Sequence, residues 1–490
     1  MISGAIDWFR RNNELHGWAM VVLAGYTYLA QGGGGYTDLS FQWISIYGFK
    51  LKRSDVQSVK AIGGLPFTLK FVIGLISDNL PIIGYNVKPY MLLMAGIGFV
   101  ALTMMGIPAL TGNFTTLSAA YLVIQLYGSS IDCLTDSLVI KKGRNDELDS
   151  TSALQSISWF MFGIGGSVFS LLATYLLVDL NAESGINLPG ARFYNLLMAI
   201  FPFGIFALSF FVKEEKSKIR PGFKVLGQQL IRLVIAFSSH IFLVLRLVAW
   251  FILAGAARFS LTIPSVMFNF TYLNISPYIQ TWIDFGSYLA LSGGVFVYYR
   301  FFRHTSFRYI YGASQILLGI FGLLDYALVQ RWNIAIGIPD VPFLFVSGVL
   351  VDGIERLQTM PFLIMAGQLC PPNIEATYFS VLMSLMSLSN YGFTIGQWIG
   401  VKVQKAHGIT YDNLDGYGPA ILLRVATTCA CVLLIWLIPD TNAMNPTNAE
   451  FIKPTHPTLK AIFKWADLDS ADEADVKGGS KAVEAVKQIA

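Results

Sequence analysis

The chain has 490 residues, of which 54% are hydrophobic and only 13% are charged, whereas an ordinary globular protein has roughly 25% charged residues. This composition excludes a conventional soluble enzyme, and apolar stretches of about 20 residues that recur along the chain predict a polytopic membrane protein. The net charge of +4 is spread over short loops without a basic stripe interleaved with aromatic residues, so nucleic acid is not an expected partner.

Twelve membrane-spanning helices in two six-helix bundles are predicted, which makes the fold class an all-α membrane protein. A short cytoplasmic segment, 1–16, precedes the first span. The spans begin near Gly17, Val56, Pro89, Leu117, Ser152, Phe193, Ile241, Pro277, Arg308, Val341, Ala376 and Pro419. The basic cytoplasmic linker 213–239 separates the N-terminal bundle, 17–212, from the C-terminal bundle, 240–439. The polar residues 440–490 predict a cytoplasmic, largely disordered tail.

Lysine and arginine set the predicted orientation, because cytoplasmic loops carry an excess of both. With both termini cytoplasmic, the outer loops hold roughly half as many basic residues as the inner loops. Glycosylation sequons at Asn113, Asn269 and Asn274 then fall in outer loops. These sequons favour the secretory route, and the N-terminus lacks the composition of a transit peptide, so the plasma membrane is the predicted location.

An internal repeat relates the two bundles by a shift of about 220 residues, a feature typical of transporter folds. The shift places Tyr298 opposite Asp78, so one acidic residue has no counterpart in the second half. Other positions correspond more closely, and they include Gly74 with Gly294, Lys88 with Arg308, Asp132 with Asp352 and Gln155 with Glu375.

The connection between the second and third spans has the composition of an inner gate. Gly74 allows two helices to approach closely, and Asp78 can pair with a basic residue such as Lys88 or with a helix terminus. Such a contact separates when two bundles rock apart. Alternatively, this segment, which also contains Gly84, is a simple connecting turn.

Ionisable residues at membrane depth are functional candidates, because each costs about 2.5 to 3.5 kcal/mol on insertion scales. They are Lys70, Asp132, Asp136, Arg246, Arg258, Asp284, Asp352, Glu355 and Arg356. Asp132 and Asp136 lie four residues apart and therefore share one helix face. Two like charges in a low-dielectric cavity do not both ionise easily, so the pair suits proton coupling. Alternatively, the pair is static and is neutralised by Lys70, Arg258 or Arg356.

Three cations within the spans could meet an anionic substrate. Lys70 lies about two helical turns deeper in the membrane than Asp78. Arg258 has small neighbours that leave room for its guanidinium to reach a central cavity, or it extends instead to the outer interface. Arg356 directly follows Glu355, so these two side chains face different sides of a helix.

Three motifs together resemble the folate-biopterin transporter family, a branch of the major facilitator superfamily. The first runs from Leu65 to Tyr90 and contains Lys70 and the gate residues. The second contains Asp132, Asp136, Gln155 and Trp159, and the third runs from Leu369 to Ser384 and contains Cys-Pro and Glu-Ala-Thr. Phe67 stands where the family usually has tryptophan, and Phe71 stands where it usually has proline, which puts substrate preference in question more than fold.

The resemblance implies a carrier of folates or pterins. The two carboxylates of the folate glutamate tail need fixed cations, and Lys70, Arg258 and Arg356 are the available ones. A flat pterin ring suits a carboxylate and an aromatic face, and Gln155 and Trp159 are further expected substrate-binding residues. Biopterin lacks the glutamate tail, and the family also includes carriers of other metabolites such as S-adenosylmethionine, a cation that would prefer the acids.

Three functional hypotheses follow. The leading one is a monomeric, proton-coupled importer of folate or pterin compounds that works by alternating access, with Asp132 and Asp136 coupling the proton. The second is a facilitator of another organic solute without proton coupling, and the third is a non-transporting receptor. No catalytic constellation, phosphate loop, cofactor motif or metal-ligand spacing occurs in the sequence, so neither an enzyme nor a metal or cofactor is expected.

Overall fold

The computed structural model describes residues 17–51, 53–144, 149–179, 186–217, 233, 241–370, 375–390, 395–409 and 413–438. In this part of the chain the regular structure is helical, apart from two isolated β-bridges. The predicted segments 1–16 and 440–490 and most of 213–239 lie outside the described residues.

The N-terminal half is built from helices between Trp18 and Ser209. They are α2 (Trp18–Gly32), α3 (Gly34–Trp43), η1 (Ile44–Gly48), α4 (Arg53–Gly63), α5 (Leu65–Thr68), α6 (Lys70–Asn79), α7 (Lys88–Gly106), η2 (Pro108–Leu110), α8 (Phe114–Arg144), α9 (Asp149–Leu176), α10 (Leu188–Met198) and α11 (Ile200–Ser209).

The C-terminal half is built from helices between Ile241 and Leu437. They are α13 (Ile241–Ala257), α14 (Thr262–Met267), η3 (Phe268–Tyr272), α15 (Pro277–Val297), η4 (Tyr298–Phe302), α16 (Phe307–Val329), α17 (Trp332–Ala335), α18 (Asp340–Leu369), α19 (Glu375–Asn390), α20 (Ile395–Ala406), α21 (Tyr417–Ala430) and η5 (Cys431–Leu437).

A helix begins within a few residues of every predicted span start. Seven helical stretches of the described chain are long and apolar enough to cross a membrane. The first predicted span is divided between α2 and α3 within a run of glycines. Gly32 is required there, because a Cβ at this position would lie 2.3 Å from the backbone nitrogen of Gly166 in α9.

Contacts between helix ends reproduce the predicted repeat. At the start of α7, Lys88 Nζ donates a hydrogen bond to the Phe210 carbonyl oxygen, 2.8 Å away just after α11. At the start of α16, Arg308 Nη2 donates to the Ile438 carbonyl oxygen, 3.0 Å away just after η5. In each half, a basic residue at the start of the third span therefore binds the end of the sixth span.

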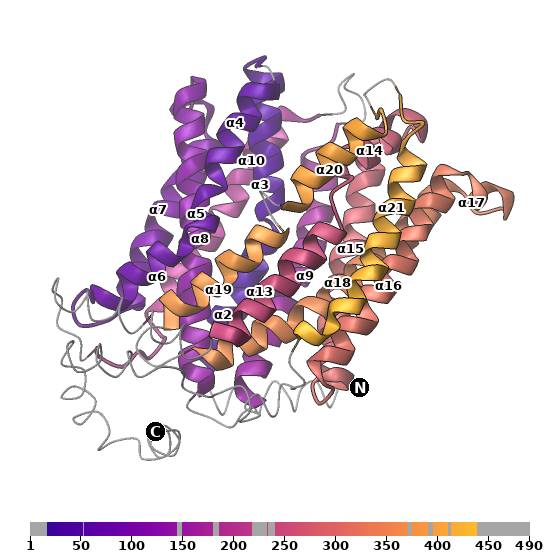
Figure 1. Ribbon diagram of the computed structural model, residues 1–490. Helices are drawn as coiled ribbons and strands as arrows, with labels where there is room; N and C mark the ends of the chain where they lie inside the picture. The colour runs from indigo at the N-terminus through magenta and orange to yellow at the C-terminus, as the bar shows by residue number, and fades with distance from the viewer. Residues whose placement is uncertain are drawn as a thin grey trace.

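The two halves meet along α9 and α15 and also at α6 and α19. Between α9 and α15, Thr174 Oγ1 donates to Thr281 Oγ1 at 2.6 Å, and Ser292 Oγ donates to the Phe160 carbonyl oxygen at 2.9 Å. Figure 1 shows α19 crossing toward α6 at the lower end, whereas α4 and α20 lie well apart at the upper end. The end at which α6 meets α19 is the predicted cytoplasmic end.

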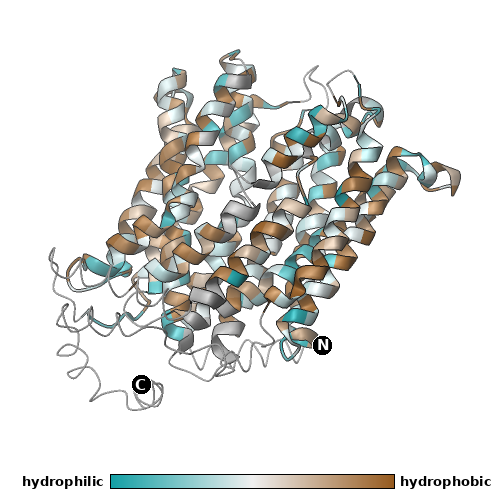
Figure 2. Ribbon diagram, in the orientation of Figure 1, coloured by the Kyte–Doolittle hydropathy of each residue, from teal (hydrophilic) through white to brown (hydrophobic). Residues whose placement is uncertain are grey.

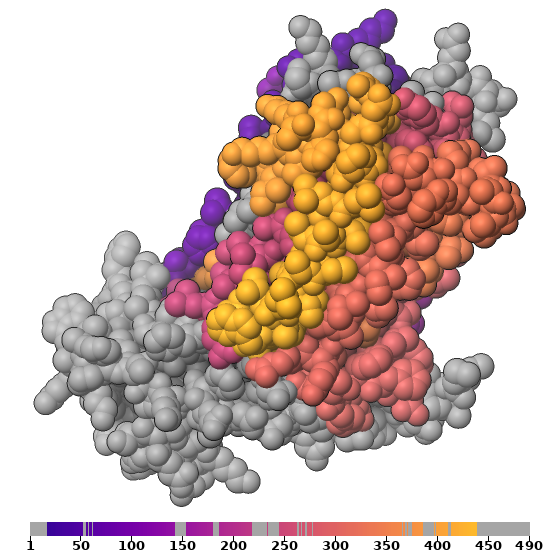
Figure 3. Space-filling model, turned by 45° about the vertical axis from the view of Figure 1, so that its right-hand side comes forward, coloured from indigo at the N-terminus to yellow at the C-terminus, as the bar shows by residue number. Residues whose placement is uncertain are grey.

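Apolar residues cover the outer surface of the helices as well as their interior. Figure 2 shows hydrophobic residues along the outer faces of both halves, and Val100 and Ile320 are among the exposed ones. In Figure 3, α21 and η5 run along the surface beside α16, and Leu433 of η5 is 81% exposed. Apolar side chains exposed at this depth suit contact with lipid.

Candidate functional site

A buried ion pair lies between the second and fourth spans of the N-terminal half. Lys70, the first residue of α6, is 5% exposed, and its Nζ lies 2.9 Å from Asp132 Oδ2 of α8. The same α6 backbone is held against α8 by Cys133 Sγ, which donates to the Lys70 carbonyl oxygen at 3.7 Å. Of the three cations that the sequence offered to the acidic pair, the structure selects Lys70 for Asp132.

Asp136 begins a chain of contacts that reaches the other half of the molecule. One helical turn along α8 from Asp132, Asp136 accepts a hydrogen bond from Tyr28 Oη of α2 at 2.5 Å. The Tyr28 ring packs edge-on against Trp159 of α9, with centroids 5.3 Å apart. The Arg356 guanidinium of α18 lies over the Trp159 ring, 4.2 Å from its centroid. This cation–π contact joins the two halves beside the acidic pair.

Two predicted substrate-binding residues have unused hydrogen-bonding groups. Gln155 is fully buried one helical turn before Trp159 on α9. Within the described chain, the Gln155 amide has no hydrogen-bond partner at its nitrogen or its oxygen. The same is true of Trp159 Nε1. Because buried polar groups are normally satisfied, these groups remain available to another molecule.

Arg258 and Glu355 form a second ion pair, in the C-terminal half. Arg258 Nη2, just after α13, lies 2.8 Å from Glu355 Oε1 at the middle of α18. The Glu355 side chain keeps 41% of its accessible surface although it lies midway along α18. It lines a pocket with Arg258, so this exposure is to a space between helices. Glu355 and Arg356 face different partners, as predicted.

Asp284 and Arg246, two further candidate charges, have other hydrogen-bond partners. Asp284 of α15 accepts hydrogen bonds from Gln280 at 3.0 Å and from Tyr36 of α3 at 3.4 Å, the latter across the two halves. Arg246 donates to the Trp436 carbonyl oxygen near the inner end of α13. Arg246 therefore tethers η5, which agrees with its position near the interface.

At the predicted inner gate, Gly74 and Asp78 contact the start of α19. Asp78 Oδ2 accepts hydrogen bonds from the Thr377 backbone nitrogen and from Thr377 Oγ1, both at 2.8 Å. The carboxylate thus caps the N-terminus of α19, where the helix dipole favours negative charge. A Cβ on Gly74 would lie 2.6 Å from the Ala376 carbonyl carbon, so the two backbones are in direct contact.

Lys88 and Gly84 lie next to this contact but serve the N-terminal half. Lys88 Nζ donates to the carbonyl oxygens of Phe210 and Val212. The hydrogen-bond partner of Asp78 is Thr377 and not Lys88. Gly84 has a φ of 81°, and its carbonyl oxygen accepts from the Ser217 backbone nitrogen at 2.8 Å. Gly84 therefore forms the tight turn that the alternative interpretation of this segment required.

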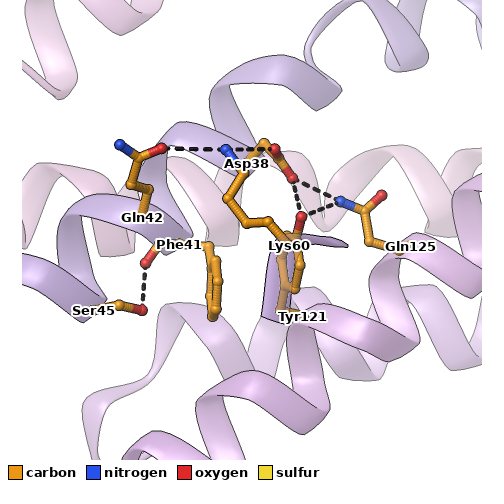
Figure 4. Close-up of polar contacts among 7 residues, drawn as sticks. All are labelled: Asp38, Phe41, Gln42, Ser45, Lys60, Tyr121 and Gln125. Atoms are coloured by element: carbon orange, nitrogen blue, oxygen red, sulfur yellow. Dashed lines mark hydrogen bonds and ion pairs between the residues drawn. The ribbon is translucent and has the colours of Figure 1, made fainter. Parts of the chain in front are cut away.

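A polar cluster in the N-terminal half was missed by the sequence analysis (Figure 4). The Asp38 carboxylate of α3 forms an ion pair with Lys60 of α4 at 3.1 Å. It also accepts hydrogen bonds from Gln125 of α8 at 2.7 Å and from the hydroxyl of Tyr121. Lys60 also donates to Gln42 Oε1 at 3.2 Å. Neither Asp38 nor Lys60 was among the charges that the sequence placed at membrane depth. The cluster joins α3, α4 and α8.

The three sequon asparagines lie at the end of the bundle opposite Asp78. Asn113 is exposed and its Oδ1 accepts from the Thr116 backbone nitrogen at 2.9 Å, which caps α8. Asn269 is half-buried within η3, and Asn274 is exposed with a φ of 51°. Their glycosylation remains a prediction.

Comparisons with known proteins identify relatives over most of the chain. The probable folate-biopterin transporter 4 of Arabidopsis thaliana is 26% identical over 491 residues, covering 89% of this chain and 98% of that protein. The folate-biopterin transporter of Synechocystis sp. (strain ATCC 27184 / PCC 6803 / Kazusa) is 27% identical over 430 residues, covering 84% of this chain and 82% of that protein.

Solved structures share the fold at low sequence identity. The MFS (major facilitator superfamily) proton:xylose symporter XylE, bound to 6-bromo-6-deoxy-D-glucose, superposes with a TM-score of 0.57 and 13% identity. The match covers 88% of this chain and 98% of that chain, so the predicted fold class is confirmed. The sequence model of the BT1 family matches residues 31–454, which is most of the chain, and the protein therefore belongs to the BT1 family.

Proposed function

We propose that the protein is a secondary active transporter that imports folate or pterin compounds by proton symport with alternating access. The names of the relatives support the substrate class. The observation that carries the proposal is the Lys70–Asp132 ion pair beside the contact chain from Asp136 to Arg356. Cations, carboxylates and an aromatic face meet there at the boundary between the halves.

Lys70 is the residue that we assign to the substrate carboxylate. Its ammonium group is buried and can exchange its partner Asp132 for the carboxylate of an anionic substrate, so that the ammonium stays paired. Gln155 and Trp159 supply unused amide and indole groups on α9, at the end of the contact chain that runs from Asp136 through Tyr28. Arg356 remains assigned to the substrate through its position over Trp159.

Asp132 and Asp136 are the groups that we assign to the proton. When a substrate carboxylate takes the Lys70 ammonium, Asp132 loses its counter-charge while Asp136 lies one turn away. Two uncompensated carboxylates at this spacing favour uptake of one proton. Substrate binding and proton binding would then be coupled through Lys70.

Alternating access would use the two contacts between the halves. The inner contact of Gly74 and Asp78 with α19 is closed in this structure, while α4 and α20 diverge at the opposite end. In a rocking motion the inner contact breaks and releases substrate to the cytoplasm.

A facilitator of another organic solute, without proton coupling, is the second candidate. The observation that favours it is that Lys70 and Arg258 are each already paired with a carboxylate. A cationic solute such as S-adenosylmethionine would compete for those carboxylates instead of the cations.

Uptake into vesicles tests the proposal. Radiolabelled folic acid and biopterin are supplied at about pH 5.5 outside and about pH 7.5 inside, a range in which a partly buried carboxylate can exchange its proton. Accumulation driven by the pH gradient is expected, and it is expected to be lost in Asp132→Asn. If folded, inserted protein accumulates neither compound, the substrate assignment is wrong. Accumulation of either compound that ignores the gradient would favour the facilitator.

Location and assembly remain predictions: a multi-pass protein of the plasma membrane, with cytoplasmic termini and a monomeric state. Trp18, at the start of the first span, contacts Phe211, just after α11, with ring centroids 5.7 Å apart. Arg308, at the start of α16, contacts Ile438, just after η5. These contacts support the even number of predicted spans. Both contacts lie at one end of the bundle.

A further inference from the structure

The connection between α16 and α18 exposes a row of large apolar side chains. This connection, residues 330–339, contains α17 and is called the α17 loop below. Trp332, Ile334, Ile336 and Ile338 are each between 39% and 68% exposed. Connections that face water are normally polar, and an exposed apolar patch marks contact with a protein or a membrane.

Polar contacts inside the α17 loop hold these side chains outward. Asn333 is fully buried, and its Nδ2 donates to the Ile338 carbonyl oxygen at 3.1 Å and to Asp340 Oδ1 at 2.8 Å. Arg331 Nη1 lies 2.9 Å from the same Asp340 oxygen. Arg331 and Asp340 are the charged residues of 330–340, so the charges of this segment neutralise each other.

The equivalent connection in the N-terminal half does not carry this row. It runs from 107 to 113 between α7 and α8, and the internal repeat places Gly112 opposite Trp332. Leu110 is the large apolar side chain that is exposed there. The row is therefore a property of the C-terminal half, and joining the third span to the fourth does not require it.

The position of the α17 loop favours lipid as its partner. In Figure 1, α17 extends sideways from the bundle, near the end opposite the α6–α19 contact and away from the N-terminal half. The Trp332 ring packs edge-on against Tyr326 of α16, with centroids 5.6 Å apart. Leu323, on the same side of α16 one helical turn deeper in the bundle, is also exposed. The apolar row thus continues onto a helix face that suits contact with lipid.

We propose that the α17 loop is an interfacial anchor whose four apolar side chains insert among the lipids of the leaflet at this end of the bundle. Tryptophan is typical of the boundary between membrane and water. The Arg331–Asp340 pair would remain at the level of the headgroups. Because the loop is joined to both α16 and α18, it would fix the depth of these two helices in the bilayer. This inference is independent of the transported compound.

Spin labels at two positions test the anchor. The four cysteines are replaced, and Ile336→Cys and Gly112→Cys are each labelled and reconstituted in phosphatidylcholine bilayers. Power saturation with oxygen, which concentrates in lipid, and with a water-soluble nickel chelate gives the depth of each label. The label at 336 should lie about 5 to 10 Å into the boundary between headgroups and acyl chains. The label at 112 should remain in water. Gly112 is the matched control, because nothing lies within 4 Å of a Cβ there.

Two results would overturn the anchor. A label at 336 that meets the nickel chelate as freely as the label at 112 would show that the loop lies in water. Protection of the label at 336 from both reagents would show that protein covers the loop, for example a second copy of this chain.

If the cysteine-free protein does not fold, Trp332 supplies the same information in the unchanged background. The fluorescence that is lost in Trp332→Phe should be quenched in the wild-type protein by lipids brominated near the headgroup and not by iodide in the water. Quenching by iodide alone would contradict the anchor.

Discussion

Replacing Lys70 with methionine is expected to reduce folate uptake at least about thirtyfold, equivalent to about 2 kcal/mol. Methionine removes the charge that holds the substrate carboxylate and leaves Asp132 without the partner that lies 2.9 Å from it. Initial rates at several substrate concentrations measure the effect. Lys70→Arg keeps the charge and should retain more uptake than Lys70→Met.

Lys60→Met is the matched control, because it removes the same side chain from the same predicted span and also breaks an ion pair. Asp38 still has hydrogen bonds from Tyr121 and Gln125 after this change, and Lys60 is partly exposed. Uptake by Lys60→Met should therefore stay within about fivefold of wild type. Equal losses of uptake in the two methionine variants would show that Lys70 has no special role in substrate binding.

Gly74→Ala is expected to reduce uptake at least about tenfold by opening the inner gate. The new Cβ would lie 2.6 Å from the Ala376 carbonyl carbon and oxygen and 2.8 Å from the Thr377 nitrogen. Backbone atoms do not move aside as a flexible side chain does, so α6 and α19 must separate. Separation also removes the two hydrogen bonds from Thr377 to Asp78.

The buried thiol of Cys370 offers a direct readout of this opening, because it lies at the end of α18 near the inner end of the bundle. In a background in which the other three cysteines are replaced, an impermeant thiol reagent applied from the cytoplasmic side should modify Cys370 faster in Gly74→Ala than in wild type. Gly96→Ala is the control, since nothing lies within 4 Å of a Cβ there. Equal labelling in both variants would show that the α6–α19 contact is not a gate.

The sequence predicted the fold well because hydrophobic span length and the internal repeat are local and periodic signals. Helices begin near each expected position, and Lys88 and Arg308 make equivalent contacts in the two halves. The spacing of Asp132 and Asp136 also placed both on one helix face. These properties depend on residues within one span or on an alignment of the halves.

Partners between distant spans were not predictable in the same way. Lys70 pairs with Asp132 and Arg258 pairs with Glu355, but the sequence left three cations open for the acidic pair. Thr377, which donates a hydrogen bond to the Asp78 carboxylate, lies 299 residues away along the chain, whereas Lys88 was the expected partner. Ion-pair choice depends on helix rotation and packing, which the periodicity of a single span does not determine.

Tyr28 shows a second reason for incomplete prediction. It binds Asp136 and contacts Trp159, yet in the sequence it was one aromatic residue among many. Most aromatic residues in membrane spans are core or interface residues, so residue type gave no reason to single it out.

The most direct test of proton-coupled transport is to record proton movement caused by substrate alone. Wild-type protein in liposomes with equal pH on both sides is given an inward folate or biopterin gradient, while an impermeant dye reports the internal pH. Import with a proton predicts internal acidification that requires substrate, and Asp136→Asn should abolish the acidification while labelled substrate still exchanges across the membrane. Substrate entry into wild-type liposomes with no change in internal pH would contradict proton symport.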